Sequence, residues 1–140
     1  MTVLSDELRQ WVDLASATVK DDELLDLTAR MVDISSPTGE EREIAEFLVD
    51  FMQESGLKAH YQPIDPNQGN AIARFRGKGS GPELLFYAPL DTAFAGDPNE
   101  DAPWIDLGNR EDKIPEAVVE NGVVIGLGAH NPKGHGACAI

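Results

Sequence analysis

The feature that most restricts the fold of this 140-residue chain is a run of four apolar residues at positions 84–87. The run, Leu-Leu-Phe-Tyr, follows Gly-Pro-Glu at 81–83 and leads through Ala-Pro-Leu to Asp91. Such a run, bounded by turn residues, is typical of a strand buried on both faces in a mostly parallel sheet covered by helices. In open sheets of this kind, functional side chains gather at the carboxyl ends of the strands. The residue at the carboxyl end of this predicted strand is Asp91. Asp is also a common turn residue, so its position alone leaves a site and a simple turn both open.

Composition limits the partners and the compartment. The length fits one domain, and 25 acidic against 11 basic residues give a net charge of -14. That charge would repel nucleic acid and anionic membranes. The first residues lack the features of a signal peptide, and no apolar run reaches the ~20 residues that span a bilayer. The single Cys138 excludes an internal disulfide and indicates a reducing compartment, so we predict a cytoplasmic protein.

Three amphipathic helices are predicted, at residues 5–20, 22–34 and 38–55. Thr38 and Glu41 have the spacing of a capping box at the start of the third helix. We expect the apolar faces of all three helices to lie in the core.

Strands are predicted at residues 57–64 and 70–76, with a turn between them. A further buried strand is expected at 123–125, and the first turn of another helix at 137–140. Residues 92–117 form a long polar loop, a length that is usually functional. Trp104 in that loop either faces a pocket or anchors the loop, and we favour the anchor.

Three blocks of this sequence resemble segments of a known protein family. Ser-Ser-Pro-Thr-Gly-Glu-Glu occupies 35–41, Ala-Pro-Leu-Asp-Thr occupies 88–92, and Gly-Leu-Gly-Ala-His-Asn-Pro-Lys-Gly-His-Gly-Ala occupies 126–137. In this order they resemble the N-terminal part of the di-zinc amidohydrolases and exopeptidases that include aminoacylase, acetylornithine deacetylase, succinyl-diaminopimelate desuccinylase and carboxypeptidase G. The likeness covers 22–140 and leaves 1–21 as an N-terminal helical extension.

The resemblance implies an α/β fold, a three-layer sandwich with a mixed, mostly parallel sheet between helices. This chain would be a partial catalytic domain without the family's lid domain. The implied reaction is hydrolysis of an amide or peptide C–N bond in a small acylated amino acid or dipeptide-like substrate, with zinc or another divalent metal as cofactor. The alternative is a non-catalytic relative that lost its metal ligands and serves as a binding or assembly module.

The resemblance also assigns site positions. Asp91 falls on the family's carboxylate that orients the metal site, which makes it the catalytic candidate. Pro89 stands where the family has a metal-binding His, and proline has no ligating atom. Asn131 stands where the family has the Asp that bridges two zinc ions, and a neutral amide is a poor bridge between dications. We therefore expect no di-zinc pair of the family's kind, and we expect a cleft lined by Pro89, Thr92, Asn131 and Lys133.

His130 and His135 offer substitute imidazoles for a metal, beside the alternative that they are polar residues of a Gly-rich loop. We predict that Asp91 and Asn131 lie together at the carboxyl ends of neighbouring strands. We also predict a cis peptide bond between Asn131 and Pro132. The family's backbone is cis immediately after its bridging Asp, and proline lowers the cost of that geometry.

The family's later ligands lie beyond Ile140. We therefore expect a fragment, or one chain of something larger, that belongs to an enzyme but is inactive and prone to associate alone. The expected partners are a small-molecule amide substrate, the remainder of the catalytic chain and a second copy in a homodimer.

Overall fold

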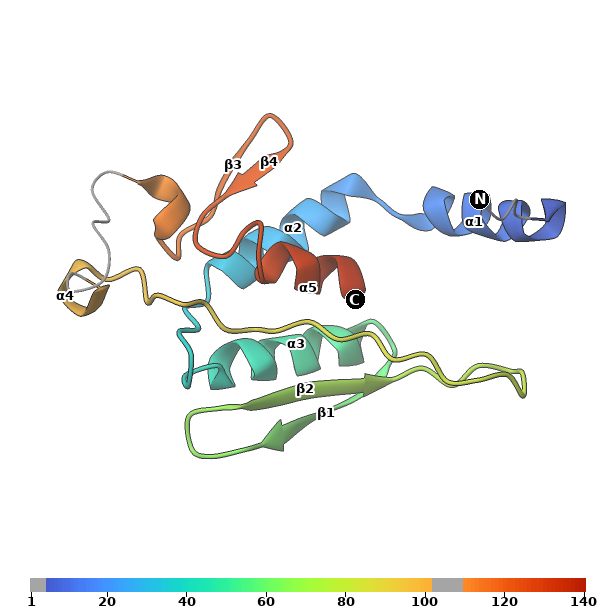
Figure 1. Ribbon diagram of the computed structural model, residues 1–140, viewed down its shortest axis with the longest axis horizontal. Coiled ribbons are helices and arrows are strands. Elements are labelled where there is room, and N and C mark those ends of the chain that lie inside the picture. The colour runs from blue at the N-terminus through green and yellow to red at the C-terminus, as the bar shows by residue number, and fades with distance from the viewer. Residues whose placement is uncertain (1–4, 102–109) are drawn as a thin grey trace.

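A computed structural model describes residues 5–101 and 110–140. The described strands form two separate antiparallel pairs, β1 with β2 and β3 with β4. Helix α3 covers the first pair, while α2 packs on α5 and contacts the second pair (Figure 1). The elements in chain order are α1 (Asp6–Thr18), α2 (Asp21–Val32), α3 (Arg42–Glu54), β1 (Lys58–Pro63), β2 (Gly69–Arg74), α4 (Pro98–Asp101), the 3-10 helix η1 (Glu111–Lys113), β3 (Val118–Glu120), β4 (Val123–Ile125) and α5 (Lys133–Ala139).

The core lies between α2, α3 and α5. Its side chains recur at helical spacing, so the predicted apolar faces of α2 and α3 are confirmed as core. The acidic first turn of α2 suits the positive end of the helix dipole, and Gly56, at φ +84°, ends α3 with its N–H bonded to the carbonyl of Gln53. The buried cluster consists of Leu27, Met31, Ile44, Leu48, Met52 and Ala137.

The apolar face of α1 is not core, which corrects the expectation for the first helix. None of its residues is buried, and Trp11 is 61% exposed. The helix itself forms from local signals, because Ser5 Oγ accepts a hydrogen bond from the Leu8 N–H at 3.3 Å and acidic residues fill the first turn. Figure 1 shows α1 extending away from the other helices. Amphipathic spacing thus predicted the helix but not a partner for it.

The prediction of a capping box at the start of α3 is also wrong. Helix α3 begins at Arg42, and the Thr38 hydroxyl donates to Asp91 instead of capping the helix. Glu41 does fold back, but its carboxylate accepts from the Gly39 N–H, at 2.7 Å. A partner distant in the sequence has displaced the local bond that the spacing favoured.

The apolar run at 84–87 is extended but not buried. Its side chains are 69–87% exposed, and within the described residues no backbone hydrogen bond joins it to a strand. Apolar composition predicts burial only where another layer covers the strand, and no described segment covers this one. The two antiparallel pairs neither establish nor exclude the mostly parallel three-layer sandwich, which stays a prediction.

Residues 123–125 and the last helix differ from the structure expected of them. Val123 is 56% exposed, because β4 pairs only with β3 around a tight turn with positive φ at Asn121 and Gly122. Residues 123–125 are therefore not a buried strand. The last helix begins at Lys133, four positions before the predicted start. Trp104 lies outside the described residues.

Candidate functional site

The first and second sequence blocks are joined by backbone pairing. Pro37 and Thr92 form an isolated parallel bridge. The Thr92 N–H donates to the Ser36 carbonyl at 2.8 Å, and the Thr38 N–H donates to the Thr92 carbonyl at 3.1 Å. These bonds fix the turn before α3 against the end of the extended segment. The fold therefore holds Asp91 next to this junction.

Buried hydroxyl groups reinforce the junction. Ser36 is fully buried, and its Oγ donates to the Leu90 carbonyl at 2.8 Å. Thr92 is 3% exposed, and its hydroxyl donates to the Phe94 carbonyl at 2.7 Å and lies 3.3 Å from the Ser36 carbonyl. Buried polar groups are costly unless paired, so these bonds explain why small hydroxyl residues stand here.

Asp91 is half-buried and oriented by one contact. The Thr38 hydroxyl donates to its Oδ2 at 2.8 Å. Among the described residues, no other side chain is hydrogen-bonded to this carboxylate. Oδ1 is therefore the oxygen that is left to accept a hydrogen bond from a ligand or to pair with a positively charged group of the ligand.

The third block meets the second at Gly128. Its φ is +82°, and a Cβ placed there would lie 3.0 Å from Cγ2 of Thr92 and 3.2 Å from Cγ and Cδ of Lys133. Glycine is needed both for the positive φ and for this close approach. Thr92 and Lys133, two of the predicted site residues, are therefore packed around the same backbone position.

Lys133 is fully buried, and its ammonium faces the carboxyl end of α2. Nζ donates to the Ile34 carbonyl at 2.5 Å and lies 3.5 Å from the Val32 carbonyl. Burial lowers the pKa of Lys133 to about 8, and the nearby Asp33 carboxylate partly opposes that shift. In this structure the charged end of Lys133 binds backbone carbonyls at the end of α2 and just beyond it. Its place in a substrate cleft stays a prediction.

The remaining candidates lie at or near the surface. Asn131 and His130 are exposed, and His135 is exposed on α5. The Asn131–Pro132 peptide bond is cis, as predicted. Pro89 is half-buried. That Asp91 and Asn131 line one cleft stays a prediction.

The donor set does not fit a pair of zinc ions. Pro89 has no ligating atom, and Asn131 has no charge to bridge two cations. Within residues 5–101 and 110–140, no three His, Cys, Asp or Glu side chains are grouped so that they could hold a metal. We therefore assign no step of chemistry to a metal held by these residues.

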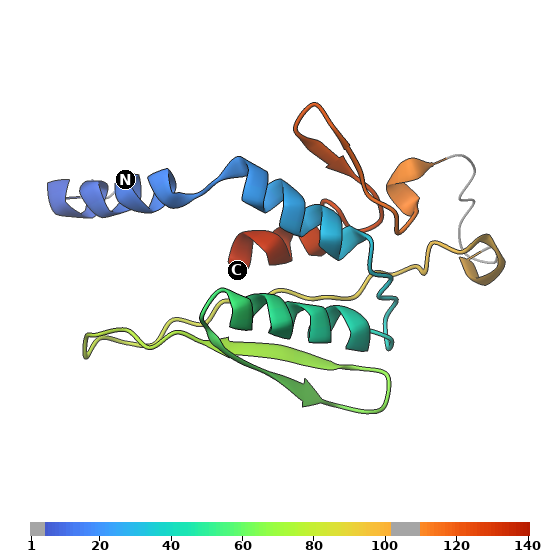
Figure 2. The same cartoon turned by 180° about the vertical axis from the view of Figure 1, so that it is seen from behind.

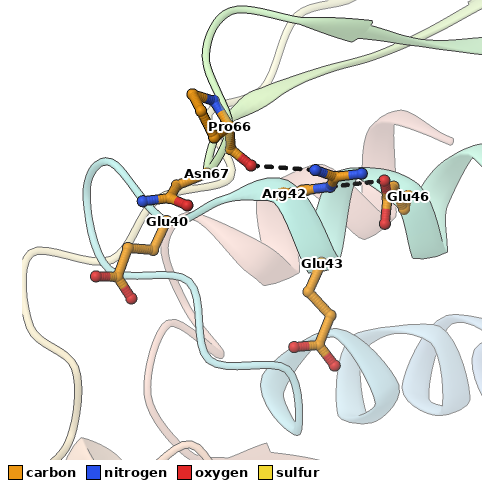
Figure 3. A pocket seen from close by; sticks show the side chains of 6 residues that line it. All are labelled: Glu40, Arg42, Glu43, Glu46, Pro66 and Asn67. Atoms are coloured by element: carbon orange, nitrogen blue, oxygen red, sulfur yellow. Dashed lines mark hydrogen bonds and ion pairs between the residues drawn. The ribbon is translucent and has the colours of Figure 1, made fainter.

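Two open cavities lie near the first block. One, of about 390 Å³, is lined by Glu40, Arg42, Glu43, Glu46, Pro66 and Asn67 (Figure 3). Its basic group, Arg42, is already bonded to Glu46 at 2.9 Å and to the Pro66 carbonyl at 3.1 Å. This ion pair is local to the start of α3, so we interpret the cavity as a surface hollow and assign it no ligand.

The second cavity adjoins the Asp91 junction and has a volume of about 530 Å³. It is lined by Pro37, Thr38, Ala93, Phe94, Ala95, Glu100 and Asp101. Asp101 is 5% exposed and accepts from the Ala95 and Gly96 N–H groups at 3.1 and 2.8 Å. Sequence reasoning missed this loop anchor, because one Asp among many in a polar loop gives no distinguishing signal.

Comparison with known proteins gives a partial match. No protein-family model matches the chain. It is 29% identical over 119 residues to a protein of Pyrococcus furiosus, and 31% identical over 116 residues to one of Thermococcus kodakarensis. Both are named as candidate LysW-lysine/LysW-ornithine hydrolases. Each match covers 83% of this chain but only 28% or 27% of the relative. Among the described residues, no helix has the length and apolar character to cross a membrane. At a coarse level, the chain is similar to hydrolases.

Proposed function

We propose that this chain forms part of a hydrolase that cleaves the amide bond of a small acylated or LysW-linked amino acid. The observation that carries the proposal is the hydrogen bond by which Thr38, a residue that lines the second cavity, orients Asp91. The names of the two relatives support the reaction class, and they suggest lysine or ornithine as the amino acid. A net charge of -14 would attract such a cationic amino acid.

In this proposal Asp91 positions the substrate. Its Oδ2 is held by Thr38, which leaves Oδ1 to accept a hydrogen bond from an amine or amide of the substrate. Phe94 and Pro37 provide apolar walls in the adjacent cavity, and Glu100 adds a second negative charge. We assign the activation of water to other residues of the enzyme. These lie in the part that corresponds to the three quarters of each relative that this chain does not match.

A binding or assembly module is the second candidate. Pro89 and Asn131 favour it, because proline has no ligating atom and a neutral amide is a poor bridge between two metal ions. A module of this kind would keep the Asp91 junction and the cavity but would not turn substrate over.

A chimera of the Thermococcus kodakarensis relative tests the proposal. This chain replaces the segment that it matches, and hydrolysis of LysW-linked lysine is followed. We expect turnover, with a loss of at least a hundredfold on Asp91→Asn and no change on Asp112→Asn, an exposed aspartate in η1. An inactive chimera that still binds the substrate, beside an active parent enzyme, would favour the binding module instead.

A further inference from the structure

We propose that Lys133 is a positioning residue for Asp91 and acts through the connection between α2 and α3, residues 33–41. The inference rests on the proposed function, because it concerns the carboxylate that the proposal assigns to the substrate. Lys133 begins α5, and Ile34 lies 99 positions earlier in the chain, yet Nζ of the lysine donates to the Ile34 carbonyl at 2.5 Å. The third block is thereby tied to the connection that carries Thr38.

The ammonium of Lys133 bonds only to main chain among the described residues. Its two acceptors are the carbonyls of Ile34 and of Val32, the last residue of α2, which lies 3.5 Å away. Carbonyls at the carboxyl end of a helix have no partner within the helix, and they favour a positive charge nearby. A lysine from a distant segment supplies both here, and its full burial shields the contact from water.

The stem of the same side chain packs on the other half of the junction. A Cβ on Gly128 would lie 3.2 Å from Cγ and Cδ of Lys133 and 3.0 Å from Cγ2 of Thr92, so the three residues meet at one point. The Lys133 N–H also donates to the Gly128 carbonyl at 2.9 Å. Figures 1 and 2 show α5 beginning beside the carboxyl end of α2, with the extended segment passing between α5 and α3. Lys133 therefore lies against both chain segments that meet beside Asp91.

The path from Lys133 to Asp91 is short. Two residues after Ile34, the Ser36 carbonyl accepts from the Thr92 N–H at 2.8 Å, and the Ser36 hydroxyl donates to the Leu90 carbonyl at 2.8 Å. Leu90 and Thr92 are the two neighbours of Asp91 in the chain. Holding the Ile34 carbonyl thus sets the backbone on both sides of the carboxylate.

The cost of burying the ammonium points to this role. Replacing a buried charged group with an apolar side chain of similar volume is often neutral or stabilising, so stability alone does not explain a lysine here. A charge-assisted hydrogen bond is shorter and stronger than a neutral one, and its direction fixes the carbonyl that accepts it. Positioning and stability should therefore separate when the ammonium is removed.

The test measures positioning and stability in one variant of the full 140-residue chain. In Lys133→Met we expect the Thr92 and Thr38 amides, which donate across the junction, to exchange hydrogen at least tenfold faster by NMR. The Leu48 amide, in the buried middle of α3, should keep its rate. The coupling energy between Thr38 and Asp91 should also vanish from a double-mutant cycle in this background.

Two controls separate the ammonium from the space that it fills. Lys58→Met, which changes an exposed lysine of β1, should leave exchange and coupling unchanged. Lys133→Cys, alkylated with 2-bromoethylamine in urea and refolded, regains an ammonium on a side chain of lysine's length. We expect it to restore slow exchange at Thr92. The same treatment of the parent chain modifies its single cysteine, Cys138, and should change nothing.

Three results would overturn the proposal. Unchanged exchange and coupling in Lys133→Met would show that Asp91 is held without the ammonium. Equal acceleration at Leu48, or a chain that does not fold, would make Lys133 a general structural residue. Failure of the alkylated cysteine to restore protection would assign the effect to packing alone. None of these measurements uses turnover, so an inactive chimera would count against the hydrolase but not against the role of Lys133.

Discussion

The hydroxyl of Thr38 donates a hydrogen bond to Oδ2 of Asp91 at 2.8 Å, across 53 positions of the sequence. The bond links the turn before α3 to the end of the extended segment. It therefore lets the α2–α3 connection set the orientation of the candidate catalytic carboxylate. The backbone pairing between Pro37 and Thr92 supports the same arrangement.

Removing the Thr38 hydroxyl should free Asp91 at a small cost in stability. We expect Thr38→Val to lower the free energy of unfolding by about 0.5–1 kcal/mol, because the bond is partly exposed to water. A double-mutant cycle with Asp91→Ala in urea would measure the coupling, and Thr38→Ser should retain it. A coupling energy indistinguishable from zero would show that the contact does not hold the carboxylate.

Ser36 should contribute more to the stability of the fold than its small size suggests. Ser36→Ala removes the donor to the Leu90 carbonyl inside a fully buried site, and we expect a loss of about 1–3 kcal/mol. Ser55→Ala is the control, because its hydroxyl bonds the Phe51 carbonyl at an exposed helix end and should change stability by less than about 0.5 kcal/mol. Equal losses in the two variants under urea denaturation would contradict this account of the junction.

Whether a feature could be predicted from the sequence depended on how far apart in the chain the interacting residues lie. Helices α2 and α3 and the β1–β2 hairpin were predictable, because apolar spacing and turn residues act within a few positions. The Thr38–Asp91 bond was not, since the same threonine also fits a capping box and only the folded chain decides between the two. Burial of the run at 84–87 was predicted wrongly, because composition shows that a strand needs cover but not where the cover comes from. The cis bond at Asn131–Pro132 was predicted from the family resemblance and is confirmed.

Gly134 should not tolerate a side chain. A Cβ there would lie within 2.2 Å of the Ala129 carbonyl oxygen, so the backbone of the third block would have to move. We expect Gly134→Ala to cost about 1–3 kcal/mol by overpacking. Gly77→Ala is the matched control, since no atom lies within 4 Å of the position that a Cβ would take there, and thermal unfolding should show little change. A Tm for Gly134→Ala equal to that of the parent chain would refute the close approach.

The burial of Lys133 predicts stability that rises with pH in the alkaline range. Its pKa is lowered from 10.5 to about 8 by burial, so between these values the folded chain has released a proton that the unfolded chain still binds. When the unfolded state binds more protons, raising the pH favours the folded state. The penalty for the buried charge is therefore full below about pH 8 and is relieved by about pH 10.5, a gain on the order of 3 kcal/mol.

Urea denaturation at half-unit steps from pH 7.5 to 10.5 would measure this rise. Lys133→Met should flatten the curve, because the substituted side chain fills a similar volume without a proton to lose. Lys58→Met, at an exposed position of β1, should leave the rise intact. The same slope in the Lys133→Met variant as in the parent chain would assign the rise to another group, and it would mean that the ammonium at the Ile34 carbonyl carries no net penalty.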